Sequence, residues 1–256
     1  MGGLEMIVHG IAFLASITSR TYMYLQSLIE NDLLPENCIV YIERNIIEST
    51  KDEVQSKDCH LYKSIMELLK KHNINYRLVL EKDINSDLIC NTISEMPQKI
   101  FIYSGYGGYI LKPHLFSLGK QFLHVHAGIL PEYRGSTTAY YSILQDSYIG
   151  ATSIFLNDKI DQGDIIYQEK FPMPSNKENI DYVYEPWVRS QVLVKTLKSY
   201  IANRGFSLRM QSNDKAETYF IIHPVLKHLA LLKVENFRRL KADEKNIIYP
   251  ESAAKN

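Results

Sequence analysis

The sequence contains few cysteines and has no excess of either charge. Its three cysteines, Cys38, Cys59 and Cys90, are widely spaced and form no Cys-x-x-Cys motif, which argues against a disulfide framework and a cysteine-only zinc site. Reduced thiols are typical of the cytoplasm, so a cytoplasmic protein is expected. The 29 Lys and Arg residues balance 29 Asp and Glu residues. Because proteins that bind nucleic acid usually carry a basic excess or a basic face, no nucleic-acid partner is expected.

Long apolar runs are also missing. No stretch reaches the length of about 18 apolar residues that a membrane-spanning helix requires, so no membrane partner is expected. The partly apolar segment 1–15 lacks a basic start and is interrupted by Glu5 and His9. This pattern indicates a buried first strand rather than a signal peptide.

Short apolar segments alternate with segments whose apolar residues recur at helical spacing. Strands are expected at 6–13, 38–42, 76–80, 99–103 and 121–125. Helices are expected at 16–31, 56–72, 110–118, 134–144 and 179–202. The alternation predicts an α/β fold with a doubly wound, mainly parallel sheet, to which segments 150–156 and 165–171 add an antiparallel pair. We expect a catalytic domain at 1–202 and a small C-terminal subdomain at 203–256, with a strand at 218–222 and a helix at 224–240.

Two histidines stand at the end of one predicted strand. His124 and His126 are two residues apart, and side chains at this spacing leave the same face of a sheet. In an open parallel sheet, ligands bind in the crevice beyond the carboxyl ends of the strands. A single isolated histidine would more often be a hydrogen-bonded core residue. Two of them just before a loop that contains Gly and Pro predict a reacting centre.

Two further segments carry candidate residues for ligand binding. Asp161 lies in the turn between the two strands of the expected antiparallel pair, and Gly163 gives that turn backbone freedom. Alone, such an aspartate is most often an ordinary turn residue. Segment 104–108 contains a Gly-x-Gly-Gly pattern after a strand but lacks the full spacing of a dinucleotide-binding loop. A close-packed ligand loop is the better interpretation, with a plain turn as the alternative.

Taken together, these segments resemble the folate-dependent formyltransferase superfamily. That family includes methionyl-tRNA formyltransferase, glycinamide ribonucleotide formyltransferase and the N-formyltransferases of nucleotide-linked amino sugars. Its signature is Asn-x-His-x-x-Leu-Leu-Pro-x-x-Arg-Gly, followed further along by Leu-Asp-x-Gly. The matching residues here are His124, His126, Ile129, Leu130, Pro131, Arg134 and Gly135, then Ile160, Asp161 and Gly163. The resemblance is clearest over residues 99–171.

The resemblance implies a Rossmann-like enzyme that moves a formyl group from N10-formyltetrahydrofolate to a primary amine. His126 matches the family's catalytic histidine and Asp161 its catalytic aspartate. Both His126 and His124 would donate to the formyl oxygen as negative charge develops on it. Asp161 would accept the proton lost by the amine or hold His126 in the useful tautomer. The family's apolar pterin slot corresponds to the cofactor-binding candidates Tyr106, Gly107, Gly108, Tyr109, Ile110, Leu111 and Ile160.

One residue departs from the family pattern. His124 stands where the family has an asparagine whose amide helps to hold the formyl oxygen. An imidazole N–H can do the same as a neutral donor or as a cation. Because a free histidine titrates at about pH 6.5 and an amide does not, activity would then depend on the protonation of His124. The replacement is also compatible with altered or lost activity.

Elimination within the family favours a small amine acceptor. The tRNA enzymes carry a further nucleic-acid-binding domain, and the segment after residue 205 is short for it. The folate hydrolases add an N-terminal regulatory domain, and nothing precedes Met6 that would serve as one. The purine-pathway enzymes retain the asparagine. A nucleotide-linked amino sugar, used for glycan biosynthesis, is therefore the expected acceptor, and a homodimer is a candidate assembly.

Two alternatives of other classes remain open. His124, His126 and Asp161 could form a metal set, because two imidazoles and a carboxylate suit zinc or iron, which would make the protein a hydrolase or an oxygenase. That interpretation leaves the Leu-Pro-x-x-Arg-Gly segment unexplained, and we expect no bound metal. The other alternative is a non-catalytic binder of folate or nucleotide. Turnover with formyltetrahydrofolate would separate it from an enzyme.

Overall fold

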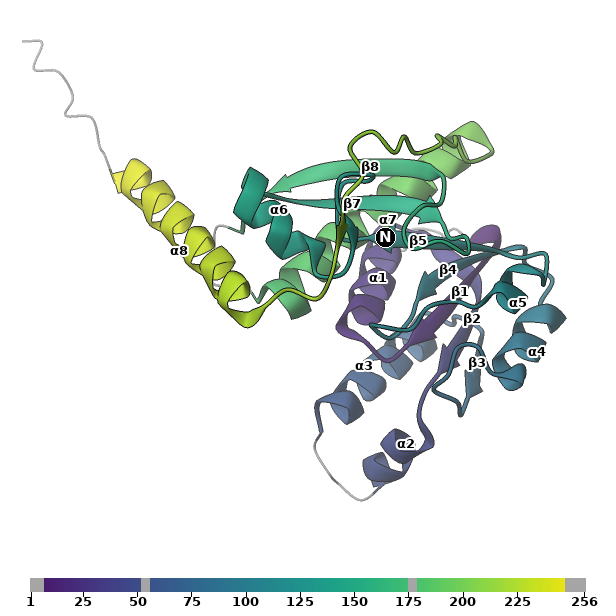
Figure 1. The fold of residues 1–256 in the computed structure, drawn as a ribbon. Coiled ribbons are helices and arrows are strands. Elements are labelled where there is room, and N and C mark those ends of the chain that lie inside the picture. The colour runs from purple at the N-terminus through teal and green to yellow at the C-terminus, as the bar shows by residue number, and fades with distance from the viewer. Residues whose placement is uncertain (1–6, 52–55, 175–178, 247–256) are drawn as a thin grey trace, which may run out of the picture.

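The apolar alternation of the sequence builds one seven-stranded sheet with helices on both faces (Figure 1). The computed structural model describes residues 7–51, 56–174 and 179–246, so expectations for segments 1–6 and 247–256 lie outside the described residues. The strands are β1 (Ile7–Ser16), β2 (Leu34–Tyr41), β3 (Tyr76–Val79), β4 (Ile100–Ser104), β5 (Gln121–His126), β6 (Arg134–Gly135), β7 (Tyr148–Phe155), β8 (Ile165–Pro172) and β9 (Thr218–Tyr219). The helices are α1 (Ser19–Glu30), α2 (Arg44–Lys51), α3 (Lys57–Lys71), α4 (Asp87–Glu95), α5 (Pro113–Phe116), α6 (Thr138–Asp146), the π-helical turn η1 (Ile180–Tyr184), α7 (Glu185–Asn203) and α8 (Pro224–Asn246).

The sheet has the order β3-β2-β1-β4-β5-β7-β8. Strand β1 pairs in parallel with β2 on one side and with β4 on the other, and β4 pairs in parallel with β5. Strand β7 runs antiparallel to both β5 and β8. The predicted α/β fold with a mainly parallel, doubly wound sheet and an added antiparallel pair is therefore confirmed.

Side-chain alternation along the strands divides the apolar core between the two faces of the sheet. On β1, Ile11 and Phe13 join one cluster of buried residues with helices α1, α3 and α7, whereas Ala12 and Leu14 join another with α4 and α5. The strands are buried on both sides, which explains why they appear in the sequence as continuous apolar runs.

Several expected elements differ in the structure. Helices α2 and α4 were not predicted, and α5 is only four residues long instead of spanning 110–118. The helix expected from residue 134 is wrong at its start, because Arg134 and Gly135 form β6 and α6 begins at Thr138. Gly135 has φ +96°, outside the helical region, and its chain pairs with β9 from the C-terminal segment.

The chain after α7 returns to the sheet before it forms α8. Arg209 makes an antiparallel bridge to Ile165 at the start of β8, and β9 pairs in parallel with β6. Helix α8 packs through Ala230 and Val234 near α6 and extends away from the rest of the molecule (Figure 1). The subdomain boundary at residue 203 stays a prediction. Within the described residues, no helix is long and apolar enough to cross a membrane.

Candidate active site

Both histidines of strand β5 face the same cavity. Leu123 and Val125 point into the apolar core, and the alternate residues His124 and His126 line a cavity of about 910 Å³. The cavity lies at the edge where β1, β4 and β5 end, with residues 17–20, 106–111 and 126–127 in its lining together with Tyr103 and His124. This is the crevice beyond the carboxyl ends of parallel strands where ligands are expected in such sheets.

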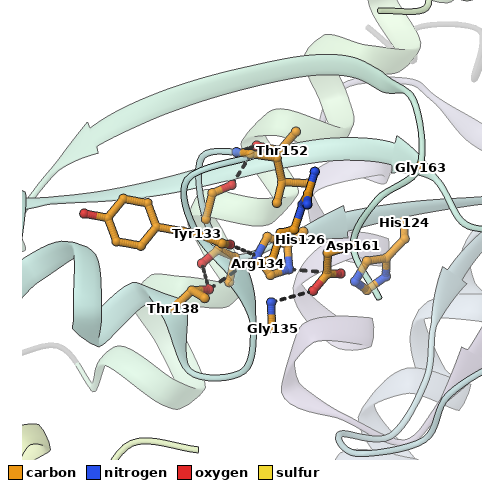
Figure 2. A network of polar contacts seen from close by, with 12 residues as sticks. His124, His126, Tyr133, Arg134, Gly135, Thr138, Thr152, Asp161 and Gly163 are labelled. Carbon is orange, nitrogen blue, oxygen red and sulfur yellow. Dashed lines mark hydrogen bonds and ion pairs between the residues drawn. The ribbon is translucent and has the colours of Figure 1, made fainter. Parts of the chain in front are cut away.

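The ring of His126 is buried and held on both sides (Figure 2). Its Nε2 lies 2.6 Å from the carbonyl oxygen of Tyr133, and its Nδ1 lies 3.3 Å from Oδ1 of Asp161. Carbonyl and carboxylate oxygens only accept hydrogen bonds, so the ring serves both partners when each nitrogen carries a hydrogen. Gly128 permits this geometry, because a Cβ there would lie 2.8 Å from the Tyr133 carbonyl oxygen and 3.0 Å from His126 Nε2.

Asp161 presents an ionised carboxylate to the cavity. Its second oxygen, Oδ2, accepts the amide N–H of Gly135 at 2.8 Å. Burial by itself would raise the pKa of Asp161. The charge and hydrogen bond of His126, the neighbouring His124 and the Gly135 amide outweigh burial and hold that pKa well below its ordinary range. Asp161 therefore stays charged at neutral pH.

The turn that carries Asp161 has to curve back along the sheet. Because β7 is antiparallel to β5, its last residue pairs with Leu123, near the start of β5, so the chain must travel back to reach His126. Gly163 makes the tight return possible, since a Cβ there would lie 1.6 Å from the carbonyl oxygen of Phe155. Asp161 itself has φ +51°, a left-handed conformation that aspartate tolerates better than most residues.

A residue that the sequence analysis missed holds this turn. The side-chain amide of Gln211 donates to the carbonyl oxygens of Asp161 and Gly163 at 2.8 and 2.7 Å. Its own oxygen accepts two hydrogen bonds from the buried guanidinium of Arg134, which also contacts Asn213. Arg134, which the family signature contains, therefore connects the segment after α7 to the turn that carries Asp161 through Gln211.

We expect Gln211→Leu to lower kcat/KM about ten- to a hundred-fold, because both hydrogen bonds that fix the left-handed turn are lost and small displacements of a reacting group are costly. The measurement is the steady-state rate of the formyl transfer that the sequence resemblance implies, with a thermal melt to confirm folding. The matched control is Asn213→Ala, which removes a contact to Arg134 but leaves the clamp on the turn. Equal rates for the two variants would show that the clamp has no role in positioning Asp161.

Both ring nitrogens of His124 contact groups that the sequence analysis did not identify. Its Nδ1 lies 3.4 Å from the carbonyl oxygen of Tyr103, and its Nε2 lies 3.4 Å from Nη2 of Arg189. Burial, followed by the positive charges of Arg189 and Arg20, holds the pKa of His124 well below its usual value. Both ring nitrogens therefore have partners, and donation from His124 to a ligand would require one of these contacts to break.

The residues predicted to bind the cofactor gather around the same cavity. Its lining includes all seven of them: Tyr106, Gly107, Gly108, Tyr109, Ile110, Leu111 and Ile160. The loop is anchored by Asn85, which donates to the Ile110 carbonyl oxygen and accepts from the Lys112 amide. Ile110 and Ile160 are 61% and 53% exposed, so two large apolar side chains stand open at the cavity. Such surface is suited to cover a flat apolar ring.

The arrangement is unfavourable for a metal ion shared by His124, His126 and Asp161. A guanidinium occupies the lone-pair side of His124, and a second cation close to it would be repelled. Across 7–51, 56–174 and 179–246, no three His, Cys, Asp or Glu side chains are grouped to hold a metal.

Comparison with known proteins identifies relatives of this chain. Residues 46–186 match a family model described as "Formyl transferase". The methionyl-tRNA formyltransferase of Listeria welshimeri is 26% identical over 117 residues, which is 44% of this chain and 37% of that protein. That of Buchnera aphidicola is 28% identical over 147 residues, which is 57% of this chain and 46% of that protein. The chain thus spans less than half the length of these curated relatives.

Solved structures share the fold. An N-formyltransferase from Helicobacter canadensis, in complex with folinic acid and dTDP-3-aminofucose, aligns with a TM-score of 0.55 at 21% identity, over 84% of this chain and 71% of that one. A 4-N formyltransferase from Francisella tularensis aligns with a TM-score of 0.56 at 17% identity, over 88% of this chain and 87% of that one. At these identities the likeness is one of fold.

Proposed function

Because this chain belongs to the formyl transferase family, we propose that it is a folate-dependent formyltransferase that moves the formyl group of N10-formyltetrahydrofolate to a primary amine. The observation that carries the proposal is the pair formed by buried His126 and half-buried Asp161, whose Nδ1 and Oδ1 atoms lie 3.3 Å apart in the cavity at the carboxyl edge of the sheet. The same cavity is lined by the loop proposed to hold the donor.

The donor is assigned to the loop 106–111 together with Ile160. The exposed faces of Ile110 and Ile160 would cover the pterin ring, and Gly108, with φ +83°, lets the backbone turn beside it. When bound, N10-formyltetrahydrofolate supplies the formyl carbon. The role of this loop is to hold that carbon near His126 and to exclude water from it.

Asp161 is assigned the role of orienting His126. A general base works best when its pKa is near the working pH, and the pKa of Asp161 is held far below neutrality. The carboxylate is therefore a weak proton acceptor but a strong hydrogen-bond acceptor for the Nδ1–H of His126. His126 is assigned to the formyl oxygen as negative charge develops on it. Because its Nδ1 and Nε2 already contact Asp161 and the Tyr133 carbonyl oxygen, donation to the formyl oxygen requires the Tyr133 contact to break when the substrates bind. Water would accept the proton that the amine loses as the new C–N bond forms, and would supply the proton that the N10 nitrogen gains as its bond to the formyl carbon breaks.

The proposed acceptor is a nucleotide-linked amino sugar. Tyr182 and Phe220 line the cavity and are 51% and 79% exposed, so the Phe220 ring and the face of Tyr182 that Lys57 does not cover are suited to stack on a base or sugar ring. Lys57, whose Nζ lies 2.9 Å from the ring centroid of Tyr182, adds positive charge suited to a phosphate. The sugar N-formyltransferases with the same fold, one of them in complex with dTDP-3-aminofucose, support this choice.

Methionyl-tRNA is the second candidate acceptor. It is favoured by the curated relatives, which are methionyl-tRNA formyltransferases. Helix α8 also contributes four basic residues before residue 240: Lys227, Lys233, Arg238 and Arg239. Against it, the chain as a whole has a formal net charge of zero. RNA binding usually rests on a basic surface.

The test is a competition between acceptors. The purified protein is incubated with N10-formyltetrahydrofolate and either a panel of dTDP-linked 3-amino and 4-amino sugars or methionyl-tRNA, and formylated products are quantified by mass spectrometry. We expect kcat/KM to be at least about a hundred-fold higher for one amino sugar. Faster formylation of methionyl-tRNA would show that methionyl-tRNA, and not an amino sugar, is the acceptor. Folate binding without formylation of any amine would contradict the proposed formyltransferase activity and would indicate a binding protein.

A further inference from the structure

The surroundings of His124 determine which of its nitrogens carries the hydrogen. The carbonyl oxygen of Tyr103, 3.4 Å from Nδ1, can only accept a hydrogen bond. The guanidinium of Arg189, 3.4 Å from Nε2, can only donate one. Both contacts are satisfied by a single form of the ring, which is neutral, has its hydrogen on Nδ1 and has a lone pair on Nε2.

Arg189 is itself held in place. It is 6% exposed, and its Nη1 donates to Oε1 of Glu185 at 2.7 Å, one helical turn earlier on α7. Arg20 on α1 approaches from another element and donates to Ser104 Oγ and to the carbonyl oxygen of Gly105. Two guanidinium groups and one carboxylate therefore meet beside His124, so these three groups present one more positive than negative charge to its ring.

The remaining charged groups that face His124 come from the catalytic pair. Asp161, in the turn between β7 and β8, favours the cationic ring, whereas His126 on β5 opposes it. The ring of Tyr103 on β4 lies with its centroid 6.0 Å from that of His124. Burial together with Arg189 and Arg20 outweighs Asp161, so these charges favour the same neutral ring that the hydrogen bonds select.

We propose that Arg189 is a positioning residue of this site, which fixes His124 as the neutral tautomer with hydrogen on Nδ1 and keeps a permanent positive charge beside the formyl group. For its catalytic consequence, the inference rests on the proposed formyl transfer. A guanidinium stays protonated across the whole working range of pH. The charge at this position is therefore constant, and the rate does not depend on a proton taken up by His124.

This arrangement replaces what the sequence alone suggested for the position. An amide would offer an N–H that never titrates, and an unrestrained histidine would titrate at about pH 6.5. Arg189 removes that pH dependence by occupying the lone pair of Nε2 with a donor that cannot be deprotonated. His124 is therefore not a titrating oxyanion donor. Its ring instead bridges Arg189 and the carbonyl end of β4.

The first test measures the tautomer directly and needs no substrate. Protein labelled with 15N-histidine is studied by NMR, and the His124 signals are assigned from their loss in His124→Asn. We expect a protonated Nδ1 and an unprotonated Nε2 from about pH 5.5 to 8. In Arg189→Met, which removes the donor and the charge, we expect a mixture of tautomers and a titration midpoint at least about one pH unit higher. A wild-type ring protonated on Nε2, or one that titrates near pH 6.5, overturns the proposal.

The second test uses the reaction. The pH profile of kcat should contain no step from His124 in the wild type and a new step in Arg189→Met that disappears in Arg189→Met/His124→Asn. Arg189→Lys, which keeps the charge, should restore the wild-type profile in part.

The control is Arg204→Met at the exposed end of α7, which should change neither readout. An Arg189→Met protein with unchanged tautomer and profile would leave Arg189 as a packing residue only. If no amine is formylated, the proposed function fails while the NMR result still decides the tautomer.

Discussion

His126→Ala is expected to lower kcat for formyl transfer by at least about two orders of magnitude. The substitution removes the ring that is held between the Tyr133 carbonyl at 2.6 Å and the Asp161 carboxylate at 3.3 Å, and with it the polar group assigned to the formyl oxygen. It also leaves the partly buried Asp161 carboxylate without its imidazole partner. The measurement is single-turnover and steady-state formylation of the best acceptor.

Two companion proteins separate chemistry from folding. His126→Gln keeps a polar side chain that can donate to the Tyr133 carbonyl oxygen, so it should fold as the wild type does and still show the large loss of rate. His228→Ala replaces an exposed histidine on α8 and should keep the full rate. A folded His126→Ala enzyme with wild-type kcat would remove His126 from the reaction.

Asp161→Asn is expected to lower kcat by about two orders of magnitude or more, although the new side chain is almost the same shape. The amide oxygen can still accept the N–H of Gly135, whose partner Oδ2 lies at 2.8 Å. The negative charge is lost, however, and an amide nitrogen turned towards His126 would select the tautomer with a lone pair on Nδ1. The control is Asp158→Asn, an exposed carboxylate in the same turn, which should leave kcat unchanged.

The same substitution predicts a dependence of stability on pH. The pKa of Asp161 is depressed in the folded protein, so its ionised form adds stability that is complete above the unfolded pKa of about 3.9. That contribution falls as the pH drops through the lower folded value. The melting temperature of the wild type should therefore exceed that of Asp161→Asn at pH 7, and the difference should shrink below about pH 4. A constant difference across this range would contradict the assigned ion pair.

Much of the fold could be predicted because its signals are local. A period of 3.6 along a helix follows from backbone geometry, and β1, β4 and β5 appear as short continuous apolar runs because they are buried on both faces. Helix α4 was missed because only Ile89, Cys90 and Ile93 of its nine residues are buried, which is too few to reveal a period. The expected helix start at residue 134 failed for a non-local reason, since Glu217 and Tyr219 accept the backbone hydrogen bonds of Arg134 and Ser136.

Of the candidate site, too, only the part that depends on local geometry could be predicted from the sequence. His124 and His126 share a face because they are two apart on one strand, and this relation holds whatever the rest of the chain does. Arg189 left a weak signal, because Glu185 and Arg189 are four apart on a helix whose buried residues include Val188 and Val192. A pair of charges among core positions indicates a buried polar contact, but the helix alone does not identify its partner.

By itself, then, the sequence determined the α/β order of elements, the two histidines at the end of β5 and an aspartate followed by a glycine in a turn. Only the tertiary structure decided that this turn curves back to place Asp161 3.3 Å from His126, that Gln211 holds it there and that Arg189 meets His124. The reason is the range of the forces involved. Strand and helix periodicity acts between neighbours in the chain, whereas these polar contacts join residues 35 to 65 positions apart in sequence and exist only once the apolar faces have packed.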